Sequence, residues 1–126
     1  MRNSVSMALL AVVAMAGCKS KSQQWSGPLS VSGTSISSIG CRPDRADRIT
    51  LYGDPSGWSI DLEPFEKDTG WNVIVNPPSG NADYLYKKDC TTFDIGFDDK
   101  STLSGHFKVD CGSRLKADVT FTKCRE

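Results

Sequence analysis

The sequence predicts an all-β fold, a small antiparallel β-sandwich or open barrel of about seven strands that carries two disulfides. Three observations predict it. Apolar residues alternate with polar ones at a period of two, and no helical period persists. Clusters of glycine, proline, serine and aspartate separate the alternating stretches. Four of the five cysteines lie among these stretches, an even number that suits a disulfide framework.

In the first two thirds of the chain, the alternation of apolar and polar residues predicts some strands more clearly than others. The expected strands begin at Leu29, Ile49, Trp58 and Trp71, with a less regular piece at Tyr84 and Tyr86. The turn residues 53–57 predict a hairpin between the second and third of these strands. Pro77 and Pro78 end the fourth, because proline has no N–H to donate to a strand ladder.

The last third predicts a three-stranded meander. Strands are expected around residues 93–97, 103–109 and 115–121, with turns at 98–102 and 112–113. Aligning the apolar faces of the first two places Phe93 opposite Phe107 and Phe97 opposite Leu103. The meander therefore fixes which strand ends lie together.

The meander also decides how the cysteines pair. Cys111 and Cys124 lie at opposite ends of the last strand, roughly 30 Å apart, whereas a disulfide needs Cα atoms within about 7 Å. The remaining pairing is Cys90–Cys111 with Cys41–Cys124. The apolar register places Asp89 opposite Cys111, so a bulge at residues 91–92 or a strand that begins only at Thr92 is needed. Zinc binding is the competing interpretation, but no two of these cysteines have Cys-x-x-Cys spacing.

The amino terminus has the layout of an export signal. Arg2 precedes an apolar run at residues 7–15 that is too short to span a bilayer, and Ala16-Gly17-Cys18 follows. This segment resembles the lipobox of bacterial lipoproteins. The resemblance implies that residues 1–17 are a signal peptide and that Cys18 becomes the lipidated first residue of the mature chain.

The resemblance also implies a domain layout and an address. Residues 18–27 are expected to form the lipidated cysteine and a flexible tether, with Trp25 at the membrane interface, and residues 28–126 a single β domain. By the same resemblance, Lys19 favours the outer membrane, with the domain facing the periplasm. The lipid on Cys18 is then the expected membrane attachment.

The net charge of the chain limits the classes of partner that it is expected to bind. The chain has a formal net charge of zero, which gives no electrostatic footprint for nucleic acid. Another envelope protein or a glycan is the expected partner. No cofactor is expected.

The candidate catalytic and metal-binding residues have simpler explanations. His106 lacks a nucleophile motif around it and is expected to be an exposed strand residue. Asp61 and Glu63 have the spacing that strand alternation alone produces. The aspartates of the 98–102 turn lack the spacing of an EF-hand loop, so no metal site is expected at Asp94, Asp98 and Asp99. The sequence thus predicts no enzyme.

The candidate binding residues are aromatic and basic. They are Trp58, Trp71, Tyr84, Tyr86, Arg42 and Arg45. The aromatics suit a platform for a sugar or a peptide, although both tryptophans also fall on apolar strand faces and suit the core. The arginines alternate with Asp44 and Asp47, which equally suits a surface segment of ion pairs. The expected function is a membrane-anchored envelope lipoprotein with a binding or scaffolding domain. The alternatives are a small inhibitor of a cell-wall hydrolase or protease and, less favoured, a hydrolase.

Overall fold

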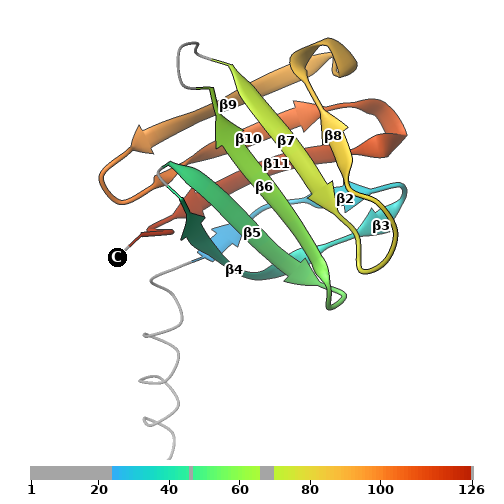
Figure 1. Cartoon of the computed structure of the whole chain (residues 1–126), viewed down its shortest axis with the longest axis horizontal. Coiled ribbons are helices and arrows are strands. Elements are labelled where there is room, and N and C mark those ends of the chain that lie inside the picture. Colours follow the sequence, from blue (N-terminus) through green and yellow to red (C-terminus); the bar gives the residue numbers. More distant parts are fainter. Residues whose placement is uncertain (1–23, 46, 66–69, 126) are drawn as a thin grey trace, which may run out of the picture.

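A computed structural model describes residues 24–45, 47–65 and 70–125. They form two antiparallel sheets, of six and five strands, that pack face to face as a β-sandwich (Figure 1). The prediction of an all-β antiparallel fold is confirmed. Cys18 and the rest of the expected export signal lie outside the described residues.

The first sheet joins the start of the chain to its end. Its strands run in the order β3-β2-β11-β10-β9, and β1 also pairs with β11. Their bounds are β1 Gln24–Ser26, β2 Leu29–Val31, β3 Thr34–Ser35, β9 Thr92–Asp99, β10 Ser104–Asp110 and β11 Lys116–Thr122. The expected meander is β9-β10-β11, and β9 forms one edge of the sheet.

The second sheet is a continuous up-and-down run in the order β4-β5-β6-β7-β8. Its strands are β4 Ser37–Asp44, β5 Arg48–Asp54, β6 Trp58–Pro64, β7 Trp71–Asn76 and β8 Asp83–Leu85. The hairpin predicted around residues 53–57 is the connection between β5 and β6. A short 3₁₀ turn, η2 (Lys87–Asp89), then carries the chain from β8 into β9, and a second, η3 (Gly112–Arg114), connects β10 to β11.

The register predicted between β9 and β10 is wrong by two residues. Phe93 lies opposite Val109, and Phe107 lies opposite Ile95. The alignment of apolar faces could not detect this, because a shift of two residues leaves every side chain on the same face. β9 begins at Thr92, which is one of the two alternatives predicted for the position of Cys90.

Both predicted disulfides are present. Cys41–Cys124 joins edge strand β4 of one sheet to the residue two positions after β11 of the other, with Cα atoms 5.1 Å apart. Cys90–Cys111 joins the start of β9 to the end of β10. The first bond connects the two sheets, and the second fixes two neighbouring strands of one sheet.

The expectation that Trp25 belongs to a flexible tether is wrong. Trp25 lies in β1 opposite Phe121 and is only 2% exposed. Its indole N–H donates a hydrogen bond to the carbonyl oxygen of Tyr52 in the other sheet, at 2.9 Å. The β domain therefore begins at least as early as Gln24. Among the described residues, no helix is both long and apolar enough to cross a bilayer.

We predict that Trp25→Ala lowers the free energy of unfolding by about 3–5 kcal/mol, because it empties a core position and removes the hydrogen bond to Tyr52. Urea denaturation of the purified chain measures this. Ser26→Ala, a change at the next and exposed residue of β1, is the matched control and should lie within about 0.5 kcal/mol of the parent. Equal midpoints for the two variants would contradict the place of Trp25 in the core.

Candidate functional site

A groove of about 610 Å³ lies beside edge strand β9. Residues from the end of β6, the start of β7, the η2 segment and β9 line it. They are Phe65, Gly70, Trp71, Tyr86, Lys87, Lys88, Phe93, Asp94 and Ile95. The groove lies where the two sheets meet, and four of its nine lining residues are aromatic.

The core supports the floor of the groove. Trp71 is 8% exposed and contacts Phe97 edge-on, with ring centroids 5.3 Å apart. Phe97 contacts Phe121 in the same manner at 6.3 Å. Aromatic pairs of this geometry are favourable beyond the area they bury. The floor is therefore held in place from beneath.

One wall is Phe65, which is 39% exposed. Its N–H donates a hydrogen bond to the carbonyl oxygen of Gly70, at 3.0 Å, and its ring lies against Gly70. A Cβ at position 70 would lie 2.7 Å from this ring, so the close approach requires glycine. The absence of a side chain at Gly70 thus sets the position of Phe65.

The other wall is Tyr86, and the adjoining η2 turn fixes its backbone. The Tyr86 N–H donates to the Asp89 carboxylate at 2.9 Å, and the Asp89 N–H donates to the Tyr86 carbonyl at 2.8 Å. Cys90, the next residue, is bonded to Cys111. The segment that carries Tyr86, Lys87 and Lys88 is therefore held at its end by a disulfide.

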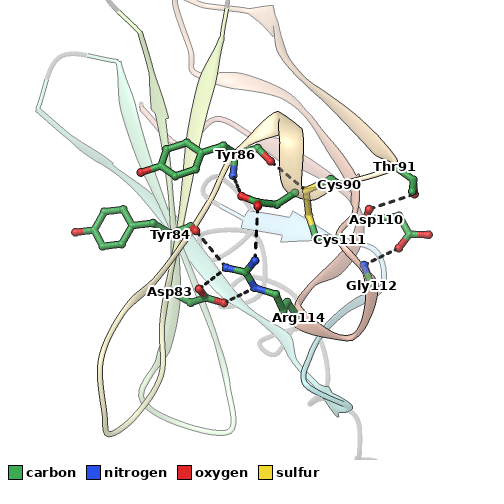
Figure 2. The surroundings of a disulfide bond; sticks show 10 residues. Asp83, Tyr84, Tyr86, Cys90, Thr91, Asp110, Cys111, Gly112 and Arg114 are labelled. Carbon is green, nitrogen blue, oxygen red and sulfur yellow. Dashed lines mark hydrogen bonds and ion pairs between the residues drawn. A yellow bond between two sulfur atoms is a disulfide. The ribbon is translucent and has the colours of Figure 1, made fainter.

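Arg114 holds the same segment from the side (Figure 2). Its guanidinium donates to both carboxylate oxygens of Asp83, at 2.6 and 3.1 Å, and to the Tyr84 carbonyl at 3.3 Å. The hydrogen bond to Asp83 raises the pKa of Arg114 further above its already high usual value. Figure 2 shows the rings of Tyr84 and Tyr86 pointing away from Arg114, so this contact positions the strand without occupying either ring.

Two lysines lie at the rim of the groove. Lys87 and Lys88 are exposed, and neither forms an ion pair with another described residue. The one acid of the lining, Asp94, contacts His106 through a carboxylate oxygen that lies 3.1 Å from the His106 Nε2. Among the described residues, the charged side chains of the lining that have no ion pair are thus cationic.

The predicted binding residues do not form one site. Trp71 and Tyr86 line the groove, and Tyr84 lies beside it on β8 with 53% of its surface exposed. Trp58 packs against the core at a separate small hollow beneath β1 and β5. Arg42 lies over the ring of Tyr52, 5.6 Å from its centroid, and Arg45 lies in the β4–β5 connection.

The groove also contains residues that the sequence did not single out. These are Phe65, Lys87, Lys88, Phe93 and Ile95. Phe93 and Ile95 have the alternation of core residues, and only the edge position of β9 leaves them partly open. In the sequence, the Lys87-Lys88 pair beside Tyr86 is the feature that indicates a basic rim next to an aromatic residue.

The carboxylate pair of β6 is part of a structural network. Asp61 is 7% exposed and accepts hydrogen bonds from Arg48 at 2.7 Å, Thr50 at 2.7 Å and Asn76 at 3.1 Å. Arg48 also reaches Glu63 at 3.5 Å, and the hydrogen bond to Asp61 raises the pKa of Arg48. Both carboxylates therefore have protein partners on a sheet face rather than in a cleft.

The acids near the β9–β10 turn also have local partners. Asp94 and Asp98 lie on either side of His106, at 3.1 and 3.4 Å from its two ring nitrogens. Asp99 accepts hydrogen bonds from the hydroxyl and N–H of Ser101, and the first of these lowers its pKa. Within the described ranges, no group of three or more histidine, cysteine or acidic side chains is placed to hold a metal ion.

Comparison of the chain with protein-family models, curated proteins and solved structures finds no match. The site is therefore interpreted from its own geometry.

We predict that Asp61→Ala lowers the free energy of unfolding by about 3–5 kcal/mol, because it leaves Arg48 and the buried Thr50 hydroxyl without their principal acceptor. Glu63→Ala, which removes a more exposed partner of the same arginine, should cost less than about 1 kcal/mol. Urea denaturation of both variants measures the difference. A negligible cost for Asp61→Ala would mean that the network is not structural.

Proposed function

We propose that this protein is a membrane-anchored envelope lipoprotein, and that its β domain binds another envelope component through the groove beside β9. The observation that carries the binding role is the groove itself, which combines the partly exposed rings of Phe65 and Tyr86 with two lysines that form no ion pair among the described residues. Sites with aromatic walls and a few placed charges are typical of ligand recognition. The groove is also held by a disulfide and by Arg114, so little ordering is needed on binding.

The membrane anchor rests on the Ala16-Gly17-Cys18 sequence and on where the fold begins. β1 begins at Gln24, six positions after Cys18. Six residues span at most about 20 Å when fully extended. A lipid on Cys18 would therefore keep the β domain close to the bilayer surface, facing the periplasm if the outer membrane is its address.

The non-enzymatic part of the proposal rests on how the reactive groups are used. The four cysteines of the β domain are paired in disulfides, which removes them as thiol nucleophiles. Asp61 and Glu63 are bound by Arg48, and His106 lies on an exposed strand between two aspartates. The cysteines, Asp61, Glu63 and His106 do not line the groove. Asp94, which contacts His106, does.

We predict that the protein takes up label when its bacterial host grows with an alkyne fatty acid, and that it fractionates with the outer membrane. Cys18→Ser should remove both the label and the membrane association, because one thiol carries the anchor. The Cys90→Ser/Cys111→Ser variant keeps Cys18 and is the control that should retain the label. Unlabelled parent protein in the soluble fraction would overturn the anchor.

We further predict that a photo-crosslinking amino acid in place of Phe65 captures one recurrent envelope component in living cells, because Phe65 is an exposed wall of the groove. The same amino acid in place of Lys108, an exposed residue of β10 outside the groove, is the control and should capture none. Equal or absent capture at the two positions would contradict the groove as the binding surface.

A second candidate, a small inhibitor of a cell-wall hydrolase or protease, has one observation in its favour. Tyr84 projects from edge strand β8 beside Tyr86, the kind of exposed aromatic that can enter an active-site cleft (Figure 2). The crosslinking experiment separates the two functions, since an inhibitor would capture a hydrolase whose activity the purified protein suppresses.

A further inference from the structure

The groove is lined by edge strand β9. Three consecutive residues of this strand, Phe93, Asp94 and Ile95, line it. Side chains of consecutive strand residues point to opposite faces, so a hollow that touches all three either passes the strand's edge or contacts the backbone of its middle residue. The backbone of β9 is therefore part of the groove.

β9 is also a long edge strand without proline. The edge strands β3 and β8 contain only two and three residues, and β4 carries Pro43. Both β4 and β9 have one register shift, which in β9 lies at its far end, next to Asp98. β9 has eight residues and no proline, and among the described strands it pairs only with β10. Its outward N–H and C=O groups are available to another strand.

The charge at this edge selects the kind of strand that fits. Lys87 and Lys88 lie at the end of the groove where β9 begins, without ion pairs to other described residues, while Asp94 already contacts His106. A segment with carboxylates would complement the two lysines. An apolar side chain of the same segment would fit between Phe65, Trp71 and Tyr86.

We propose that the ligand of the groove is an extended acidic peptide segment of a partner protein, which adds to β9 as a further strand. This inference rests on the groove being the binding surface, as proposed above. Main-chain hydrogen bonds to β9 supply affinity, and the aromatic groove and the lysines supply specificity, as in other cases of strand addition. A glycan or an anionic lipid would use the rings or the lysines but would leave the edge of β9 unpaired.

The test uses the intact chain, purified in mild detergent, and synthetic nine-residue peptides in which glutamate alternates with valine around a central phenylalanine. Fluorescence anisotropy measures binding, and hydrogen exchange of the β9 amides measures strand addition. We expect the acidic peptide to bind and to slow exchange of β9 amides that do not face β10. A peptide with lysine in place of glutamate should bind at least tenfold more weakly, and one N-methylated at alternate residues should not bind.

Charge reversal of the rim supplies the matched variants. Lys87→Glu/Lys88→Glu should weaken binding of the acidic peptide at least tenfold, whereas Lys108→Glu/Lys116→Glu, exposed residues outside the groove, should not change it by more than twofold. Both pairs are exposed, so circular dichroism should show an unchanged fold. Equal effects of the two pairs would overturn the inference.

Other outcomes of these experiments would also overturn strand addition or the proposed function. Binding of an acidic oligosaccharide or of phosphatidylglycerol vesicles that depends on Lys87 and Lys88, without slower β9 exchange, would overturn strand addition while leaving the groove as a binding surface. Self-association that buries the β9 edge would assign it to a second copy of the chain and overturn it as well. Capture through Phe65 in cells together with no peptide binding would refute this inference alone, whereas peptide binding without capture would refute the proposed function.

Discussion

The Cys41–Cys124 bond is the constraint on which the sandwich most depends, since it ties the edge strand of one sheet to the end of the other. It connects residues 83 positions apart, against 21 for Cys90–Cys111. In the chain-entropy model these loops correspond to about 4.5 and 3 kcal/mol, a large share of the ~5–15 kcal/mol that stabilises a typical domain. Trp25 makes a second connection between the same sheets through its hydrogen bond to Tyr52. With the sheets joined in this way, Phe121 packs against Phe97, and Phe97 packs against Trp71 in the floor of the groove.

The second disulfide has a more local consequence. It lies where the chain leaves β8 of one sheet and enters β9 of the other, and Arg114 binds Asp83 and the Tyr84 carbonyl just before that point. Between these two attachments the chain carries Tyr86, Lys87 and Lys88. A connection of this kind would ordinarily be among the more mobile parts of a small domain. Here the attachments convert it into one wall of a groove whose other wall, Phe65, is positioned by contact with Gly70.

The all-β class, the meander and both disulfides follow from the sequence because each rests on period-two alternation or on distances along a straight strand. The register of β9 does not, because a shift of two residues preserves every face. Trp25 was misassigned because its polar neighbours resemble a linker, and only pairing with β11 across the whole chain explains its burial. Trp71 and Tyr86 could be nominated as aromatic binding residues, but their convergence with Phe65 and Phe93 depends on how two sheets meet. The alternation of apolar and polar residues indicates which side chains of a strand are buried, but not how two sheets pack against each other.

The direction of the strands separates the groove from the expected anchor. β1 begins opposite Thr122, at the carboxyl end of β11, whereas β9 begins opposite Asp110, which itself lies opposite Lys116 at the amino end of β11. The start of the fold and the lysine rim of the groove are thus at opposite ends of the same sheet, and Figure 1 shows β1 and the start of β9 at opposite ends of the sandwich. A strand of seven residues spans roughly 20 Å. A lipid on Cys18, as proposed, would join the chain nearest the end of the sheet that lies opposite Lys87 and Lys88. The two lysines therefore do not lie beside the proposed attachment point, which favours a partner over the headgroups of an anchoring bilayer as their ligand.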